Sequence, residues 1–398
     1  MAGGHTIARD PDGRVVFVRG ALPGETVMVE ITESKKDFAR ADVVDVIEPS
    51  ASRVVPPCPH RLEGCGGCDW QHVAPTAQLA AKVSVVTDAL RRTARLPDAD
   101  VVAGGSVPAD GYRTTVRVVG TDQGTAGFRQ ERSHDTVSAD GCLVAHPRLV
   151  ELIDSMSLTP GLEVTLRCST STSERVALWD PRLGEVLGLP ADVATGADAV
   201  FHEAVGRAQL RVSAMSFFQS GPEAARLLVD AVRRAAPELT GARHVVDLYA
   251  GVGLFAAAAV PAGVPVTLVE SSLTAVADAR VNVPGAEIVA EEVGAWRPGR
   301  SRRGGGGGSD RGRSRVTDVV IADPPRTGLG APGASTVLAV GAATVVLVSC
   351  DPAAAARDTA LLVGGGYRHG GTEVLDLFPH THHVETVTRF TRVEGEAS

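Results

Sequence analysis

The sequence lacks any apolar run long enough to cross a lipid bilayer. Its only near-continuous apolar stretch, GLFAAAAVPAGV at residues 253–264, is well short of the roughly 20 residues that a membrane-spanning helix needs. Its start, MAGGHTIARD, lacks the charged leader and apolar core that typify a secretion signal. We therefore expect a cytoplasmic protein that does not bind membranes.

The sequence also lacks an excess of positive charge, since the formal net charge is −8 at pH 7. This excludes a surface coated with basic residues, and with it indiscriminate nucleic-acid binding. A local basic groove is still compatible with the composition, because affinity for phosphate depends on where the charges lie.

Cysteine is rare as well. Six cysteines among 398 residues do not form the kind of disulfide framework found in small secreted domains. Three of them lie close together in the stretch CPHRLEGCGGCDWQH, namely Cys58, Cys65 and Cys68. The others are Cys142, Cys168 and Cys350, of which Cys168 falls in an expected strand and is interpreted as a core residue.

The patterning of the chain predicts a multidomain protein with three parts. Residues 1–50 alternate in short strands and resemble a small β-barrel of the OB type. Residues 51–212 carry the cysteine cluster, one helix near 74–93 and further strands, which predicts a central α+β region. Residues 213–398 alternate between strand and helix, which predicts an α/β domain with a largely parallel sheet. Within it, the Gly- and Arg-rich segment 297–315 has no apolar periodicity and is expected to be a disordered loop.

A glycine-rich turn in the last part predicts a site for a nucleoside-containing cofactor. In HVVDLYAGVGLFAAAAV an apolar strand reaches Asp247 and is followed by Gly251 and Gly253, which would let a ligand approach the backbone. A second strand ends at Glu270, at a distance that suits hydrogen bonding to ribose hydroxyls. GVGLFA also fits the loose dinucleotide pattern G-x-G-x-x-A, so this turn alone leaves an NAD-type oxidoreductase open.

A second motif, VVIADPPRTGL, ends another strand at Asp323 and two prolines. The prolines stiffen the turn and would hold Asp323 over the carboxyl edge of the sheet, where α/β proteins bind ligands. Asp-Pro-Pro at this place is common in methyltransferases and is not a dehydrogenase feature. The preferred cofactor is therefore S-adenosylmethionine.

Two further residues have ordinary explanations when each is taken alone. Cys350, in VVLVSCDPAAAARD, lies between a buried strand and a helix that Asp351 can cap and Pro352 can begin. The positive end of that helix favours a thiolate, although a lone cysteine is more often a small buried residue. Glu385, in FPHTHHVETVTRF, lies in an expected strand, with His383 on the same face, where solvent exposure is the simpler expectation.

Together these motifs resemble a known family. DLYAGVGLF, DPPRTGL, SCDPAAAARD and FPHTHHVET have the order and spacing of the RNA uracil-C5 methyltransferases, SFFQSG at 216–221 resembles the motif before their catalytic sheet, and CGGCDWQH resembles their iron–sulfur segment. The resemblance implies an N-terminal TRAM domain and a C-terminal class I, Rossmann-like methyltransferase domain. It also implies Cys350 as the nucleophile that adds to uracil C6, and Glu385 as the base that removes the C5 proton. The residues that it places around S-adenosylmethionine are Gln219, Tyr249, Glu270, Glu292 and Asp323.

The same resemblance gives the cysteine cluster a fourth member. Cys142 takes the place of the family's fourth ligand beside Cys58, Cys65 and Cys68. Four thiolates satisfy either a [4Fe–4S] cluster or a tetrahedral zinc ion, and the resemblance favours iron–sulfur.

The expected activity is methylation of C5 of one uridine in structured RNA by a monomeric enzyme. Ribosomal RNA of the large subunit (23S rRNA) is preferred as substrate over transfer RNA. The target base has to leave its stack to reach such a pocket. Besides the oxidoreductase, a non-catalytic RNA-binding protein that retains the fold is kept as an alternative.

Overall fold

The computed structural model describes residues 2–299 and 316–393 of the chain. Most of the predicted Gly/Arg-rich loop, residues 300–315, lies outside the described residues. Within the described ranges, no helix is long and apolar enough to span a membrane.

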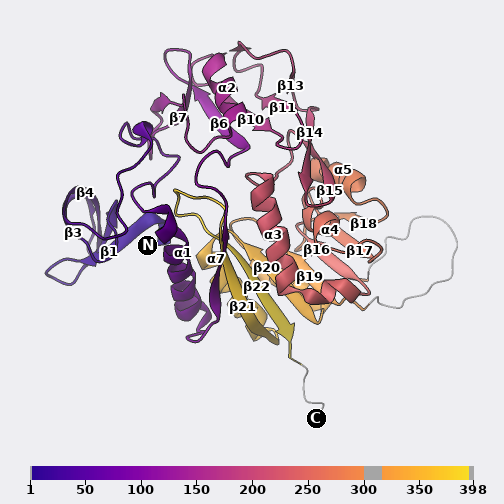
Figure 1. Cartoon of the computed structure of the whole chain (residues 1–398). Helices are drawn as coiled ribbons and strands as arrows, with labels where there is room; N and C mark the ends of the chain where they lie inside the picture. Colours follow the sequence, from indigo (N-terminus) through magenta and orange to yellow (C-terminus); the bar gives the residue numbers. More distant parts are fainter. Residues whose placement is uncertain (1, 300–315, 394–398) are drawn as a thin grey trace.

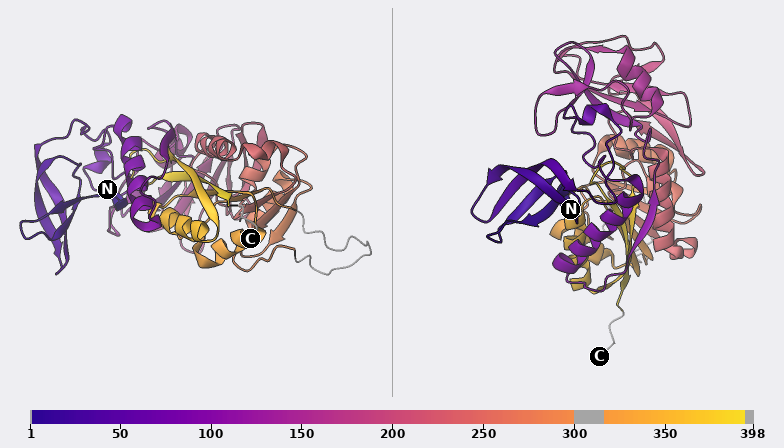
Figure 2. Two further views of the ribbon diagram at one scale, coloured as in Figure 1. Left: turned by 90° about the horizontal axis from the view of Figure 1, so that it is seen from below. Right: turned by 60° about the vertical axis from the view of Figure 1, so that its left-hand side comes forward.

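The N-terminal strands form a four-stranded sheet that extends from one end of the molecule (Figures 1 and 2). Its strand order is β1-β2-β4-β3, with β2 and β4 parallel. Val16, Val18, Ala39 and Ala41 alternate with more exposed residues and form a small core, as expected for strands with one buried face. In the described part β1 and β3 are edge strands, so this pairing does not close the predicted barrel. The strands follow a short 3-10 helix, η1 (Ala2–Gly4), and are β1 (His5–Arg9), β2 (Val15–Arg19), β3 (Thr26–Ser34) and β4 (Phe38–Glu48).

A largely irregular segment with the cysteine cluster leads to the predicted helix. A 3-10 helix, η2 (Pro59–Arg61), is followed by α1 (Pro75–Ala89), which begins with proline and continues into a π-helical turn, η3 (Leu90–Ala94).

The central region is built on a six-stranded sheet of order β13-β11-β10-β6-β7-β8. Helix α2 packs on it and buries Leu149, Leu152 and Ile153 in a core that also contains Cys168, which confirms that this cysteine is a core residue. The elements are β6 (Thr115–Gly120), β7 (Ala126–Arg129), β8 (Thr136–Ser138), α2 (Pro147–Ser155), β9 (Ser157–Leu158), β10 (Glu163–Cys168), β11 (Arg175–Leu178), β12 (Val186–Leu187) and β13 (Val193–Thr195). A hairpin of β14 (Val200–Val205) and β15 (Ala208–Ser213) follows.

The last part of the chain forms most of an eight-stranded sheet of order β18-β17-β16-β19-β20-β22-β21-β5. The first five strands in this order are parallel, whereas β22 is antiparallel to β20 and to β21. Val245 faces a core that includes α3 and α4, and Val246 faces a core that includes α6, so the strands are covered on both faces as in α/β proteins. The elements are α3 (Pro222–Ala235), η4 (Pro237–Gly241), β16 (Val245–Leu248), α4 (Leu254–Ala258), β17 (Val266–Glu270), α5 (Leu273–Asn282), β18 (Glu287–Ala290), β19 (Val319–Ala322), α6 (Gly330–Val340), β20 (Thr344–Ser349), α7 (Pro352–Gly364), β21 (Tyr367–Asp376) and β22 (Glu385–Arg392).

One strand departs from the predicted division of the chain. Residues 101–106, which the sequence places in the central region, form β5 (Val101–Ser106) and pair in parallel with β21 at the edge of the C-terminal sheet. Helix α1 packs near the same strands, β21 and β5. The division at residues 50 and 212 stays a prediction, and this segment crosses it.

Candidate active site at the carboxyl edge of the eight-stranded sheet

Cys350 lies where β20 ends and α7 begins. Asp351 caps the helix by accepting a hydrogen bond from the backbone N of Ala354 at 2.7 Å, and Pro352 occupies the first helical turn. Both features agree with the sequence expectation. The thiol is half-buried at this junction.

The surroundings of the Cys350 thiol oppose the effect expected of the helix end. Burial, followed by the nearby carboxyl groups of Glu385 and Asp323, raises the pKa of Cys350 to about 11, and Arg326 opposes this shift. Desolvation disfavours the charged form of the thiol and so acts against the helix end.

Glu385 is brought beside Cys350 by strand pairing. It is the first residue of β22, which lies between β20 and β21, and Ser349 pairs with Thr386 in antiparallel register. The next pair in that register places Cys350 opposite Glu385. Glu385 is only 5% exposed, so the simpler expectation of a solvent-exposed carboxylate is wrong. His383 lies in the loop before this strand and is not part of it.

The Glu385 carboxyl is held in an environment that disfavours its charge. Burial, and next the neighbouring Asp323, raises the pKa of Glu385 well above its usual value, whereas Arg326 lowers it. A carboxylate in such a place is a stronger base than one in water.

Asp323 follows β19, the parallel neighbour of β20, so its carboxyl reaches the same sheet edge. Its backbone N donates to the carbonyl of Leu248 at 3.3 Å, and burial raises the pKa of its carboxyl to about 7. The structure thus gathers Cys350, Asp323 and Glu385, with Arg326 as the nearby cation.

The glycine-rich turn lies at the same edge, between β16 and α4. Gly251 and Gly253 have φ angles of 56° and 87°, in the left-handed region that glycine adopts without strain. Glu270, at the end of the adjacent strand β17, accepts hydrogen bonds from the backbone N of Gly251 at 2.8 Å and of Ser272 at 2.7 Å. Its carboxylate therefore fixes the shape of the turn and keeps lone pairs available for a ligand.

Asp247 was not among the predicted site residues, although it lies in the motif that predicted the turn. It is fully buried, and its Oδ2 accepts from the backbone N of Ala256 at 3.1 Å, while its Oδ1 has no hydrogen-bond partner among the residues that the structure describes. Burial raises the pKa of Asp247 to about 8, and the carboxyl groups of Asp323 and Glu270 add to the shift. Its position near the end of a strand, just before a glycine-rich turn, is the sequence feature that could have identified it as a site residue.

Tyr249 follows β16 with a φ of 59°, which is unusual for a residue other than glycine. Burial, and then the nearby Asp358 and Glu292, raise its phenol pKa to about 12. Glu292 itself is exposed, in the turn after β18. Gly333 on α6 lies so close that a Cβ there would stand 2.6 Å from the Tyr249 hydroxyl.

Gln219 is buried in the loop between β15 and α3. This loop is fixed from two sides. Arg167 donates to the carbonyls of Ser213 at 3.1 Å and Ser216 at 2.7 Å, and Asp278 on α5 accepts from the backbone N of Ser213 at 2.9 Å and from the hydroxyl of Ser216 at 2.7 Å.

The four predicted metal ligands line one cavity of about 470 Å³, far from Cys350 in the sequence. Burial raises the pKa of the Cys65, Cys68 and Cys142 thiols, that of Cys68 to about 12, and the neighbouring cysteines add to each shift. In residues 2–299 and 316–393, no three His, Cys, Asp or Glu side chains are grouped as a bound metal ion requires. The cavity wall also contains five arginines: Arg61, Arg113, Arg117, Arg129 and Arg132.

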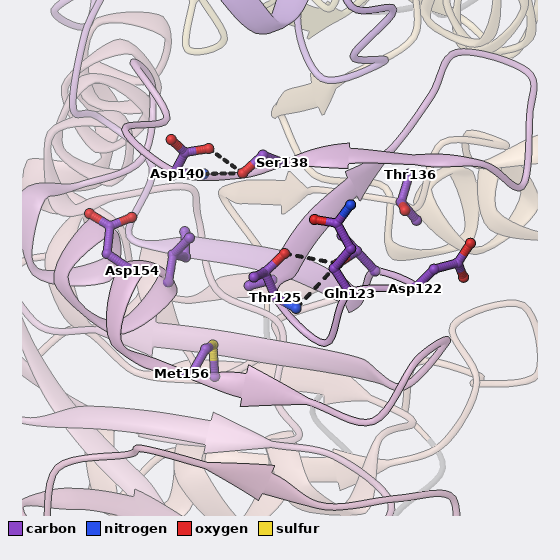
Figure 3. A pocket seen from close by; sticks show the side chains of 11 residues that line it. Asp122, Gln123, Thr125, Thr136, Ser138, Asp140, Asp154 and Met156 are labelled. Atoms are coloured by element: carbon purple, nitrogen blue, oxygen red, sulfur yellow. Dashed lines mark hydrogen bonds between the residues drawn. The ribbon is translucent and has the colours of Figure 1, made fainter.

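A second cavity, of about 490 Å³, lies in the central region (Figure 3). Asp122, Asp140 and Asp154 contribute to its wall, and Ser138 forms hydrogen bonds with Asp140. None of the predicted site residues lines this cavity.

Comparison with known proteins gives a consistent set of relatives. Residues 2–44 match the TRAM domain family. An uncharacterized RNA methyltransferase of Streptomyces avermitilis is 36% identical, over 97% of this chain and 94% of that protein. Another from Corynebacterium glutamicum is 33% identical, over 96% and 92% of the two chains. The fold resembles the crystal structure of Pyrococcus abyssi tRNA (uracil-54, C5)-methyltransferase in complex with S-adenosyl-L-homocysteine, with a TM-score of 0.71, 24% identity and coverage of 97% of this chain and 100% of that chain.

Proposed function

The chain belongs to the family of RNA methyltransferases, and on that basis we propose that it transfers a methyl group from S-adenosylmethionine to C5 of a uridine in RNA. One observation carries this proposal: the Cys350 thiol directly follows β20, and the buried Glu385 begins the paired strand β22, close enough for its carboxyl to raise the pKa of that thiol. A binding module has no use for such a pair, whereas uracil-C5 methylation needs both groups.

Uracil C5 is a weak nucleophile and has to be activated. In the proposed reaction the Cys350 thiolate adds to C6, and the electron pair released at C5 attacks the methyl carbon of the sulfonium, which leaves as S-adenosylhomocysteine. Glu385 then takes the C5 proton, and elimination of the thiolate restores the ring double bond. Because burial raises the pKa of Glu385, its carboxylate is a stronger base for this step than an exposed one.

The cofactor site that we propose surrounds the glycine-rich turn. Tyr249, Glu270 and Glu292 follow or end β16, β17 and β18, at the edge where α/β proteins bind ligands. Gln219 would complete the site from the loop before α3. Asp323 would lie between the methyl donor and the uracil.

We propose that Cys58, Cys65, Cys68 and Cys142 hold a [4Fe–4S] cluster, with zinc as the alternative. The four thiols line one cavity and are ligands of the kind that either group takes, although within residues 2–299 and 316–393 they are not grouped as a bound metal ion requires. We propose that it stabilises the fold or contacts RNA, because methyl transfer from S-adenosylmethionine involves no electron transfer. Iron and sulfide analysis of anaerobically purified protein tests this assignment, and zinc at one equivalent without iron would overturn it.

The proposed substrate is 23S rRNA, with transfer RNA as the alternative. The names of the curated relatives specify RNA only, whereas the structural neighbour is named as a tRNA enzyme. We propose a cytoplasmic, monomeric enzyme whose TRAM domain contacts RNA.

The test uses 23S rRNA fragments and transfer RNA transcripts in which uridine is replaced by 5-fluorouridine. Fluorine at C5 cannot be removed as a proton, so the nucleophile stays attached to C6 and forms a denaturant-resistant adduct. We expect an adduct with one RNA class that requires S-adenosylmethionine and is lost in Cys350→Ala. Cys168→Ala, a substitution of a core cysteine, is the matched control and should form the adduct.

Absence of an adduct with both RNAs, from protein with its cluster intact, would contradict the proposed mechanism. RNA binding that is unchanged in Cys350→Ala, with no methyl transfer by the parent protein, would favour the non-catalytic alternative. Binding of NAD but not of S-adenosylmethionine would favour the oxidoreductase.

A further inference from the structure

The loop between β21 and β22, residues 377–384, leads directly into Glu385. This loop is fixed mainly by residues that precede the C-terminal part of the chain. Residues 69–112 form hydrogen bonds with five of its backbone groups. Three carbonyls accept: Phe378 O from Lys82 at 3.1 Å, Pro379 O from Tyr112 at 3.1 Å, and His380 O from Trp70 N at 2.8 Å. Two N–H groups donate: His380 N to Gln78 at 2.7 Å and His382 N to Asp69 at 3.0 Å.

The loop contains a backbone conformation that needs such support. His380 has a φ of 65° and is 2% exposed. A residue other than glycine in this region is strained and persists only where its surroundings fix it. Its backbone N and O are held by Gln78 and Trp70, so the strain is maintained by the segment that follows the cysteine cluster.

Of these five bonds, the one to Asp69 involves the loop residue nearest to Glu385 in the sequence, His382. One carboxylate oxygen accepts from the backbone N of His382 at 3.0 Å, and the other lies 2.6 Å from Nδ1 of the same residue. Two hydrogen bonds to one residue fix both the backbone and the ring. Val384, between this residue and Glu385, is 1% exposed, so a shift of the loop would be transmitted to the carboxyl.

We propose that Asp69 is a positioning residue for Glu385: its bonds to His382 hold the 377–384 loop so that the carboxyl can reach the C5 proton. This inference rests on the proposed function, and it assigns a role in the proton-removal step to the segment beside the cysteine cluster. Misplacement by about 1 Å is enough to slow a catalytic step on the order of 100-fold.

The proposal predicts a specific defect in Asp69→Ala. Addition of Cys350 to C6 and methyl transfer to C5 would proceed, but removal of the C5 proton would be slowed at least tenfold. The methylated intermediate, still bonded to Cys350 through C6, would then accumulate with ordinary uridine. If Asp69 served only the stability of the fold, its loss would reduce the rates of all steps together and would not trap this intermediate.

The experiment incubates full-length protein with unmodified RNA and S-adenosylmethionine carrying a labelled methyl group. Denaturing gels then separate labelled free RNA from labelled RNA–protein adduct. We expect Asp69→Ala to accumulate adduct and release product at least tenfold more slowly, while trapping with 5-fluorouridine RNA stays at the parent level. Asp69→Asn, which can still accept from His382 N, should remain close to the parent.

Glu174→Ala is the matched control. Glu174 also binds both the backbone N (2.7 Å) and Nδ1 (3.0 Å) of a histidine, His202, but in the central region. It should turn over like the parent. If Asp69→Ala does not fold, His382→Ala removes the ring contact with Asp69 but keeps the backbone N–H bond, and is expected to accumulate the same adduct to a smaller extent.

Asp69→Ala turning over like the parent without trapped adduct would overturn the proposal. Loss of trapping with 5-fluorouridine RNA in a folded Asp69→Ala protein would also overturn it, because Asp69 would then act on addition or on RNA binding. Failure of the parent itself to form an adduct would instead contradict the proposed function.

Discussion

The ionisation of Cys350 gives the sharpest quantitative test of the site. With a pKa of about 11, about one thiol in a thousand is ionised at pH 8. A free cysteine, with a pKa of roughly 8.5, is ionised to roughly a quarter at that pH. Because the thiolate is the reactive form, alkylation of Cys350 without RNA should be on the order of 200-fold slower than that of a free thiol.

The assay is alkylation with iodoacetamide between pH 7 and pH 10, followed by mass spectrometry of the peptide that contains Cys350. The rate should rise about tenfold per pH unit without a plateau below pH 10, since the thiol pKa lies above this range. Peptide-level detection separates this cysteine from the other five in the sequence.

Two substitutions should move the profile in opposite directions. Glu385→Gln removes a carboxyl that raises the pKa of Cys350, so alkylation at pH 8 should become faster even though methylation fails. Arg326→Gln removes the cation that lowers this pKa, so alkylation should become slower. A plateau below pH 9 in the parent, or slower alkylation in Glu385→Gln, would refute the reasoning and mean that the helix end outweighs burial.

Three further predictions concern the surroundings of the site. In the parent the Lys82 ammonium lies 2.6 Å from the buried Asp376 carboxylate. Lys82→Met removes this cation and should lower the free energy of unfolding, measured in urea, by about 3–5 kcal/mol. An unchanged unfolding midpoint would contradict this. Gly333→Ala places a Cβ 2.6 Å from the Tyr249 hydroxyl, so the ring has to move. Calorimetry should then show S-adenosylmethionine bound roughly tenfold more weakly. Parent-like affinity would mean that the ring moves without affecting the ligand. Glu270→Ala removes the acceptor of two backbone N–H groups and should also weaken binding of the same ligand, by about 1–3 kcal/mol. Parent-like affinity would exclude a role for Glu270 in shaping the turn.

Local sequence signals predicted the surroundings of Cys350 well. The apolar strand, the Asp351 cap and the proline at the start of α7 depend on neighbours within a few residues, so the sequence contains the information. The ionisation of the thiol depends on Glu385, Asp323 and burial, which come from distant segments. The helix-end argument, which considers only neighbours in the sequence, does not include these contributions.

The environment of Glu385 could not be read from its own segment. Alternation in HHVETVTRF predicted a strand but not that β22 would lie between β20 and β21, and this placement is what buries the carboxyl. Likewise, no local pattern in residues 101–106 indicates that they pair with β21. Strand pairing between distant segments is a tertiary property, whereas propensity and periodicity report only on local structure.

The pairing of β5 with β21 has a consequence for how the chain can be divided. A fragment beginning at residue 213 would contain the proposed chemical groups but would leave one side of β21 without its partner. The exposed row of N–H and C=O groups is a template for association with other chains, and the 377–384 loop would lose the residues that hold it. During synthesis on the ribosome, β5 and residues 69–112 are made before β21 and β22. They are therefore present when these last strands are added to the sheet. The catalytic part is therefore expected to be a poor independent unit, one that aggregates when expressed alone and folds when residues 69–112 precede it.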